Sequence, residues 1–525
     1  MPAAKVIFGT KNLTQTIAST VKGVNFVEGR TIRGPVGDPS IIFNSWPGFV
    51  KVHGGLTNDS DAPRLVKRIL ENGGSIRFNR VAHYTDVTDA ETLTALKAGP
   101  IIISDAPVDG TPPTEPLFQL VPKYPGADYN NVTVKVAAGS NNQPGYFDLT
   151  ISHATDPTLL EEYRNLFIEG KPTASKSTYL KSVIEGSGLV DVTYSDLSIL
   201  TDPAAVPIDI ETAFAGGVDG DPADAVDYIG DSNSRTGFHA FDEYDDAMQL
   251  GVLDFDDDTI HIAGAAYATN RKDLIYQISL SNDLTTKTAL IDKRESLTID
   301  TKFVEFVGGG IKILDLLTGQ ILPSSNLADL MILCNKTSQN YGEYYSHAGN
   351  TRGLVNNSLG VVNNFGSPAT SKDLDNLIDA GINMFINRDG QIKLWGNRSG
   401  QYAYDQERFT SIVRLIIFIK KSLRPTLEDF LEEPNDIPTW KRMYYTVKPF
   451  MDSLVTKRAL YSYEWQGDQF SKGLNGLTIN DATDVTNGKY VVRIVLKAIG
   501  SIQEINVDMI LTPGGISFET ANELI

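Results

Sequence analysis

The ten residues LEEPNDIPTW, at positions 431–440, constrain the fold more than any other stretch of this sequence. Their centre is a run of turn-forming residues: Glu433, Pro434, Asn435 and Asp436. Proline cannot continue a helix, because it lacks an N–H and clashes with the preceding turn, and Asn and Asp favour turns and helix caps. A basic and apolar run precedes the segment, and a second helical pattern starts near Trp440. The sequence therefore predicts two helices joined at a sharp corner.

The first of these helices is predicted over SIVRLIIFIKKSLRP, residues 411–425, and Pro425 is expected to end it. At about 100° per residue, its basic side chains share roughly a third of the helix circumference: Arg414, Lys420, Lys421 and Arg424. The apolar side chains lie opposite: Ile412, Leu415, Ile416 and Leu423. The basic stripe either faces solvent or docks on an acidic partner. Lys441 and Arg442, on the second helix, offer a competing basic surface.

Two strands are predicted after the second helix, over residues 489–499 and 502–511, with Gly500 and Ser501 as a short hairpin turn. In the second strand, apolar Ile505, Val507 and Met509 alternate with polar residues. This alternation is typical of a sheet with one buried and one solvated face. The edges of such a sheet invite further strands.

Composition excludes several protein classes. A chain of 525 residues exceeds one ordinary core and suggests about three domains at roughly 150 residues each. No apolar run is long enough for a transmembrane helix, and the N-terminus has no secretory signal pattern. The net charge of −19 argues against nucleic-acid binding by the whole chain. Cys334 is the single cysteine, so no internal disulfide can form.

Elements earlier in the chain alternate between helix and strand. Residues 61–74 predict a helix that starts with Asp61 and Pro63 and ends at two glycines, and the strand-like SIRFNRVAHY follows it. Together they indicate a βαβ-like unit. Strands are also predicted around 132–136, 145–154 and 187–196. The remaining helices are expected over PTLLEEYRNLFIEG, residues 157–170, and SKDLDNLIDAG, residues 371–381.

No local motif for catalysis or cofactor binding stands out, and no cofactor is expected. The six histidines lack a metal-binding spacing, and GGGIK at 308–312 lacks the GK[ST] of a phosphate-binding loop. Two acidic clusters could supply carboxylates to a divalent ion, or could simply form turns and helix caps. The weak metal candidates within them are Asp219, Asp221, Asp254 and Asp256.

Several segments, in matching order along the chain, resemble the contractile tail sheath proteins of bacteriophages and related injection machines. They are GVNFVEG, PVGDPSIIFNS, ENGGSIRFNRV, PGADYNNVTVKV, FAGGVDGD, DYIGD, TGFHAF, the GIN and WG-x-R elements of AGINMFINRDGQIKLWGNRS, EEPNDIPTW and KPFMDSL. Each motif alone is weak, but their collinear order makes the set informative. Residues 341–362 and the acidic stretch around 240–260 depart from the family pattern.

The resemblance implies an α+β multidomain fold. A C-terminal α/β sheath domain would pack helices on an open sheet that ends in a β-hairpin, and outer β-rich α/β domains would be inserted in the core. The implied divisions are an N-terminal extended arm at 1–20, sheath core at 21–100, inserted outer domains at 101–300, core again at 301–400, a tube-proximal domain at 401–511 and a C-terminal arm at 512–525.

It also implies a mechanical function without catalysis. Sheath subunits form stacked hexameric rings around a tail tube and contract to drive it through the host envelope. The implied partners are copies of the chain itself, the tail tube protein, and baseplate and tail terminator proteins, with no nucleic acid and no membrane insertion. The implied location is the virion tail, after assembly in the bacterial cytoplasm.

The implied contacts fall in two groups. The tube-facing candidates are Arg414, Lys420, Lys421, Arg424, Lys441 and Arg442. The arm and sheet-edge candidates, which would add strands to neighbouring subunits, are Val6, Ile7, Phe8, Ile505, Val507, Met509, Ile516 and Phe518. The corner residues Glu433, Pro434, Asn435, Asp436 and Trp440 are expected to be structural.

Two alternatives stay open at this point. The chain could belong to a non-phage contractile injection system, which the sequence does not separate from a phage tail. It could also be a carbohydrate-active or metal-dependent enzyme that uses the acidic loops, because paired carboxylates meet in space rather than in sequence.

Overall fold

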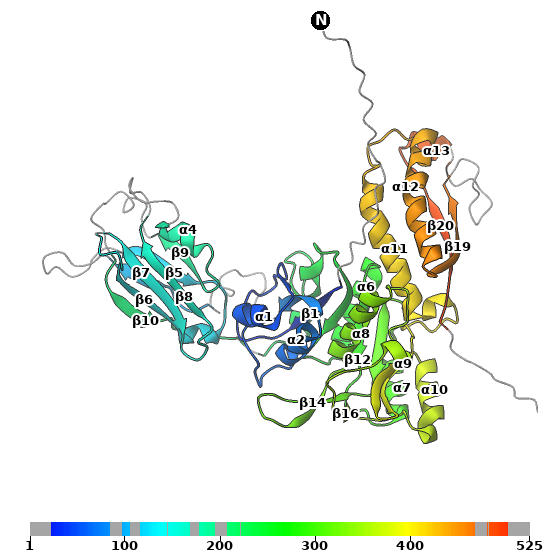
Figure 1. The fold of residues 1–525 in the computed structure, drawn as a ribbon, viewed down its shortest axis with the longest axis horizontal. Coiled ribbons are helices and arrows are strands. Elements are labelled where there is room, and N and C mark those ends of the chain that lie inside the picture. The colour runs from blue at the N-terminus through cyan, green and yellow to red at the C-terminus, as the bar shows by residue number, and fades with distance from the viewer. Residues whose placement is uncertain are drawn as a thin grey trace, which may run out of the picture.

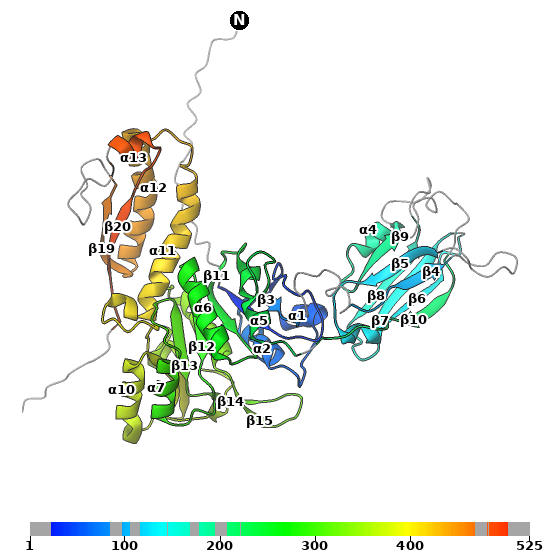
Figure 2. The same ribbon diagram turned by 180° about the vertical axis from the view of Figure 1, so that it is seen from behind.

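The computed structural model has three regions: a central α/β domain, an outer β domain and a C-terminal α/β domain (Figure 1). It describes residues 23–83, 97–104, 116–143, 145–168, 178–194, 207–220, 222–467, 480 and 482–501. The outer and C-terminal domains lie on opposite sides of the central domain in both ribbon views (Figures 1 and 2). The predicted α+β multidomain class is confirmed.

An eight-stranded sheet forms the centre of the molecule. In spatial order its strands are β18 (Gln391–Trp395), β17 (Ile382–Arg388), β13 (Val304–Gly308), β12 (Ile275–Ser279), β11 (Ala247–Val252), β1 (Val24–Gly29), β3 (Ser75–Arg80) and β2 (Ile42–Phe43). The six inner strands are parallel, and the edge strands β18 and β2 pair antiparallel. The predicted βαβ-like unit is confirmed by the parallel pairing of β1 with β3.

Helices cover both faces of this sheet, as expected for buried parallel strands. Phe26 of β1 faces a core formed with α6 (Asp258–Arg271), α7 (Lys287–Ser296) and α10 (Ser371–Asp379). Its neighbour Val27 faces the opposite core, formed with α1 (Trp46–His53), α2 (Ala62–Glu71) and α8 (Leu327–Asn340). The central domain also contains shorter elements: α5 (Ala225–Ile229), α9 (Gly349–Arg352) and the small sheet of β14 (Ile311–Leu314), β15 (Ile321–Ser324) and β16 (Gly360–Val361).

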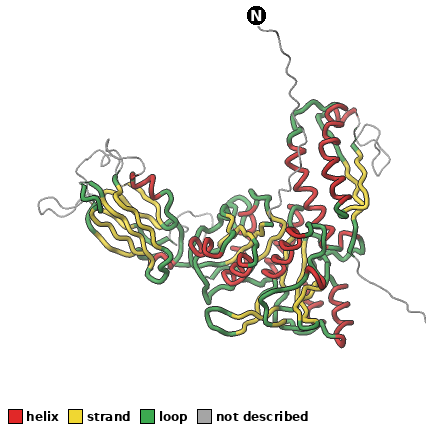
Figure 3. Tube along the Cα trace, viewed as in Figure 1, coloured by secondary structure: helices red, strands yellow, loops and turns green. Residues whose placement is uncertain are grey.

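The outer domain is a two-sheet structure with its own hydrophobic core, and its strands dominate that end of the molecule (Figure 3). One sheet contains β10 (Ile210–Ala213), β6 (Val132–Ala138), β7 (Phe147–His153) and β8 (Leu160–Leu166). The other contains β4 (Ile101–Ser104), β5 (Pro116–Pro122) and β9 (Val190–Tyr194), with α4 (Leu180–Ile184) beside it.

Two expectations for this region differ from the structure. The helix predicted over 157–170 is wrong, because β8 occupies that stretch and pairs with β7, so strand pairing overrides its helix-favouring composition. The predicted insertion extended to residue 300, whereas β11 and β12 lie in the central sheet. Every residue of β11 is buried, so no alternation distinguishes this strand in the sequence.

The neck between the outer and central domains is held by ion pairs and reciprocal hydrogen bonds. Arg33, almost fully buried, contacts the carboxylates of Asp128 at 2.7 Å and Asp156 at 3.2 Å. The PGADYNN and GGVDG segments meet here, since the Asn130 amide donates to the Gly217 carbonyl (2.8 Å) and its oxygen accepts from the Gly217 N–H (2.9 Å). These bonds give both motifs a structural role.

The folded protein is expected to lose stability in acid because of His53, a buried histidine in the central domain. The His53 ring is 1% exposed and lies among Phe43, Phe49 and Phe78. Burial, with a smaller contribution from the nearby Arg80 guanidinium, lowers the pKa of His53 to about 3.

The unfolded chain therefore takes up a proton at His53 near pH 6.5, before the folded chain does. His53 alone should therefore lower the free energy of unfolding by up to about 1.4 kcal/mol per pH unit as the pH drops below about 6.5. Urea titrations from pH 7 to 4 would measure the slope, which His53→Gln should reduce. A slope in His53→Gln equal to that of the parent chain would contradict the prediction.

The C-terminal domain consists of α11 (Thr410–Glu428), α12 (Ile437–Thr456), β19 (Leu460–Gln466), α13 (Ala482–Thr486) and β20 (Arg493–Ala498). Figure 1 shows α11 and α12 side by side with the β19–β20 pair beyond them. The prediction that Pro425 ends the first helix is wrong, because α11 continues to Glu428 with Pro425 inside it. A proline removes only one backbone bond, and it lies in the last turn and is exposed.

Candidate functional site

The predicted corner joins α11 to α12 and also ties both to the end of the sheet. The Asp436 carboxylate caps α12 by accepting from the Thr439 N–H at 2.9 Å, so the helix begins at Ile437, three residues before the predicted start. The Asn435 side chain accepts from the Trp440 indole N–H (2.8 Å) and donates to the Lys489 carbonyl (3.2 Å). The corner residues therefore fix the angle between helices and the position of the chain that leads into β20.

Aromatic stacking reinforces the same junction. The Trp440 ring, 7% exposed, stacks on Tyr490 with ring centroids 4.8 Å apart and planes 12° from parallel. Glu433 reaches forward to pair with Arg442 of α12 at 2.7 Å, an exposed contact. Pro434 contributes its fixed backbone angle.

The predicted basic stripe on α11 is not one exposed surface. The Arg414 side chain is buried and donates to the Cys334 carbonyl at 3.1 Å and the Ser338 hydroxyl at 2.6 Å. Lys421 is also buried, and its ammonium contacts the Asp273 carboxylate at 3.0 Å. Burial lowers the pKa of Lys421, and Asp273 opposes that shift. The helical wheel missed this because α11 is buried around most of its circumference against the central domain.

Exposed positive charge remains at four of the six tube-facing candidates. Lys420 and Arg424 are exposed on α11, and Lys441 and Arg442 are exposed at the start of α12. Arg424 pairs within its helix with Glu428 at 2.9 Å. Exposed pairs of this kind contribute at most about 1 kcal/mol, so these guanidinium groups can exchange partners readily.

A buried polar cluster, missed by the sequence reasoning, lies beneath α11. The Glu305 carboxylate of β13 accepts from the His347 ring at 2.8 Å and from the Asn383 amide at 3.1 Å. The Cys334 sulfur is within 3.6 Å of the Gln277 amide, which also approaches Glu305. Glu305, Cys334 and His347 are fully buried, so this Cys–His–Glu arrangement is closed to a substrate. These residues come from separate elements, so no sequence spacing could show the cluster.

The GIN and WG-x-R elements meet at the edge of this cluster. The Asn383 amide donates to the Arg398 carbonyl (2.9 Å), and its oxygen accepts from the Arg398 N–H (2.8 Å). Gly396 has a φ of 109°, and a Cβ there would lie 2.5 Å from the Asn383 oxygen. The glycine is therefore required by the close approach of Asn383.

The acidic candidates each have separate structural partners. Asp254 is buried and accepts hydrogen bonds from Arg30, Ser60 and Tyr228. Asp256 contacts the His261 ring at 2.8 Å, and Asp219 accepts from the Ala127 N–H at 2.8 Å. Asp221 lies outside the described residues. Among the described residues, two groups of potential metal ligands have their ligand atoms within 4.8 Å of one another. One is Glu305, Cys334 and His347, and the other is His83, Asp224 and Asp227. Neither group contains one of the predicted acidic candidates.

The arm and sheet-edge candidates fall outside the described residues: Val6, Ile7, Phe8, Ile505, Val507, Met509, Ile516 and Phe518. The strand predicted at 502–511 lies there too. The preceding strand is confirmed as β20, which pairs antiparallel with β19. No helix in the described part of the chain is long and apolar enough to cross a membrane.

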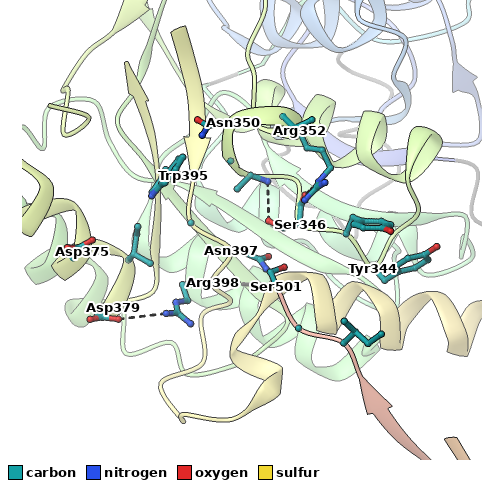
Figure 4. Close-up of a pocket in the computed structure, with 18 of the residues that line it drawn as sticks. Tyr344, Ser346, Asn350, Arg352, Asp375, Asp379, Trp395, Asn397, Arg398 and Ser501 are labelled. Carbon is teal, nitrogen blue, oxygen red and sulfur yellow. Dashed lines mark hydrogen bonds and ion pairs between the residues drawn. The ribbon is translucent and has the colours of Figure 1, made fainter. Parts of the chain in front are cut away.

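A cleft of about 960 Å³ opens where the central domain meets the end of β20 (Figure 4). Its walls come from α9 and the loop before it, from α10, and from the residues that follow β18. Ile499, Gly500 and Ser501 complete the lining.

Comparison with solved structures identifies the architecture. The chain superposes on the sheath tail protein of Listeria innocua with a TM-score of 0.56, at 11% identity, covering 91% of this chain and 95% of that one. The contracted helical sheath of the anti-feeding prophage gives a TM-score of 0.54 at 13% identity, covering 97% and 99%. This chain has the fold of the tail sheath proteins.

The match includes the outer domain as well as the core. The sheath tail protein of Desulfitobacterium hafniense gives a TM-score of 0.52 at 11% identity, covering 95% of this chain and all of that one. No protein-family model matches the sequence, and no curated protein matches it. The arrangement of helices and strands therefore shows the sheath fold, although the sequence identity to these structures is only 11–13%.

Proposed function

We propose that this chain is the structural subunit of a contractile sheath, which polymerises as stacked hexameric rings around a tube and shortens to drive the tube forward. The observation that carries this proposal is the sheath fold over more than nine-tenths of the chain, shared with a helical sheath in its contracted state. Tube, baseplate and terminator proteins would be its partners.

The domain structure supports such a mechanism. The outer and central domains have separate cores, and the neck at Arg33 joins them through a small set of contacts. Contraction would be a rigid-body rearrangement between two packings of these domains, with the terminal arms keeping subunits connected. New contacts between subunits would supply the free energy, so no bound nucleotide is needed.

A phage tail and a non-phage injection system are both compatible with this fold. Solved sheaths with the same fold include those of the anti-feeding prophage and of an extracellular contractile injection system, together with two named sheath tail proteins. We propose a phage tail sheath, located in the virion after assembly in the bacterial cytoplasm. Immunogold labelling of released particles would test this: label on tails attached to DNA-filled heads supports it, and label only on headless particles contradicts it.

The alternative of an enzyme that uses the acidic loops finds little support in their geometry. Asp254 is neutralised by Arg30 and covered by Ser60 and Tyr228, and Asp219 caps a backbone N–H in the neck. These carboxylates serve the fold. We therefore propose a mechanical role without catalysis.

The tube-facing surface is proposed at the exposed end of α11 and the start of α12. We expect the double reversal Lys441→Glu and Arg442→Glu, or Lys420→Glu and Arg424→Glu, to weaken tube binding by about tenfold or more through lost charge complementarity. Because all four side chains are exposed, unfolding free energies should change by no more than about 1–2 kcal/mol, mainly through the lost surface ion pairs of Arg424 and Arg442. Co-sedimentation of sheath with purified tubes measures the effect.

A matched control carries the same charge change on the outer domain, at Lys135→Glu and Arg164→Glu, two exposed cations. This control should bind tubes normally. Equal binding by all three double variants would place the tube contact elsewhere on the subunit.

The proposed function itself is tested by the assembly state of the purified chain. Long hollow polymers in negative-stain images, and rapid sedimentation, are the expected results. A stable monomer at every concentration and salt condition, with or without tubes, would overturn the proposal.

A further inference from the structure

The cleft beside α9 and α10 has the chemistry to hold an extended peptide. Its volume of about 960 Å³ is at the upper end of the ~300–1,000 Å³ typical of ligand pockets. Apolar surface comes from Trp395, Ile378 and Tyr344. Such a space accommodates a short run of residues rather than a folded partner.

Three arginines give the cleft its positive groups: Arg352, Arg398 and Arg458. The Arg398 Nε is buried without a hydrogen-bond partner, and its guanidinium reaches only to within 3.8 Å of the Asp379 carboxylate (Figure 4). Asp375 and Asp379 also lie at the rim, so the lining has an excess of one positive charge over these five groups. The Arg398 side chain is 14% exposed, so a carboxylate or carbonyl oxygen in the cleft would meet the outer nitrogens of its guanidinium, in a charge-assisted contact.

The chain itself leads into this cleft. Ile499, Gly500 and Ser501 line it, and the 24 residues that follow contain four carboxylates and no lysine or arginine. The carboxylates belong to Glu504, Asp508, Glu519 and Glu523. Within 502–511, apolar and polar side chains alternate, so an extended conformation would present an apolar face to Trp395 and carboxylates to the arginines.

We propose that residues 502–511 bind in this cleft of their own subunit before assembly. Binding of the segment does not depend on the proposed sheath function. Its consequence, storage of the arm until assembly, rests on that function. The tether at Ser501 gives the segment a high effective concentration at the cleft, because extended chain covers about 3.3 Å per residue. In a sheath subunit the arm would thus be stored until contact with a neighbour displaces it, which limits premature strand exchange between free subunits.

Intrachain disulfide trapping in the full-length chain tests the proposal. Cysteine pairs Thr351→Cys with Asn506→Cys, and Asp375→Cys with Asn506→Cys, place one thiol in the cleft and one in the segment. The native Cys334 is buried and should stay unreactive. Under mild oxidation of the monomer, we expect an intrachain disulfide in at least one pair, identified by peptide mass spectrometry. Adding Arg352→Glu and Arg458→Glu should slow its formation about threefold or more, whereas Lys372→Glu, outside the lining, should not.

Three results would overturn the proposal. A disulfide only in the pair Val495→Cys with Asn506→Cys would mean that the segment folds back as a hairpin strand on β20. Disulfides only between chains would mean that a second copy fills the cleft. No cross-link in either cleft pair, in variants whose circular dichroism matches the parent, would mean that the segment does not bind there. Intrachain trapping in a chain that never polymerises would contradict the sheath function and leave this binding site standing.

Discussion

Deleting residues 1–20, or residues 512–525, should leave a folded subunit that cannot form tubes. These segments are polar and rich in turn-forming residues, so they are unsuited to holding a core, and they are the arms expected to add strands to neighbouring subunits. Electron microscopy at concentrations where the full chain polymerises completely should show no tubes from either deletion.

Folding of the truncated chains must be measured alongside the electron micrographs. Thermal unfolding of each truncated chain should occur within a few degrees of the full chain, because segments this polar and rich in turn-forming residues are unsuited to core packing. A chain with 1–20 replaced by a scrambled sequence of the same composition separates loss of length from loss of specific contacts. Normal tubes from either truncated chain would refute the arm mechanism.

Replacing Arg414 with Met should cost about 2–3 kcal/mol of unfolding free energy, because buried polar groups lose a charged hydrogen-bond donor. The substitution keeps the aliphatic stem but removes the hydrogen bonds to the Cys334 carbonyl and the Ser338 hydroxyl. It also removes the contact of the guanidinium with the His347 ring, at 3.5 Å. Urea denaturation of the monomer measures the change.

Lys420→Met provides the matched control, since Lys420 lies on the same helix and is exposed. It should change the free energy of unfolding by less than about 0.5 kcal/mol. If Arg414→Met proved as mild as this control, Arg414 would contribute little to the buried cluster and α11 would be held by its apolar contacts alone.

The sequence predicted correctly those elements whose ends are marked by prolines, glycines or helix-capping residues. The α2 helix, with Pro63 in its first turn and glycines after its end, is confirmed. The corner at 433–436 is also confirmed, because Pro434 excludes helix and Asp436 caps the next one. In both cases the deciding interactions lie within a few residues of each other, so the sequence alone contains them.

Features decided by tertiary contacts could not be predicted in this way. β8 has a helix-favouring composition, and only its pairing with β7 makes it a strand. Arg414 and Lys421 share a helix face with exposed residues, yet both are buried. Arg414 binds a backbone carbonyl of α8, and Lys421 pairs with Asp273, and both partners are distant in the sequence. The Glu305–Cys334–His347 cluster likewise joins residues from separate elements. Charge on a helical wheel therefore indicated a basic surface without showing which cations are exposed.

The measurement that tests the central claim most directly is a cryo-EM reconstruction of the polymer formed by the full chain. A sheath subunit predicts a hollow helical assembly of six-fold rings, with the C-terminal domain of α11, α12 and β20 on the inner wall and the outer β domain on the outside. A reconstruction with the outer β domain lining the lumen, or a preparation that contains only discrete monomers, would contradict this account.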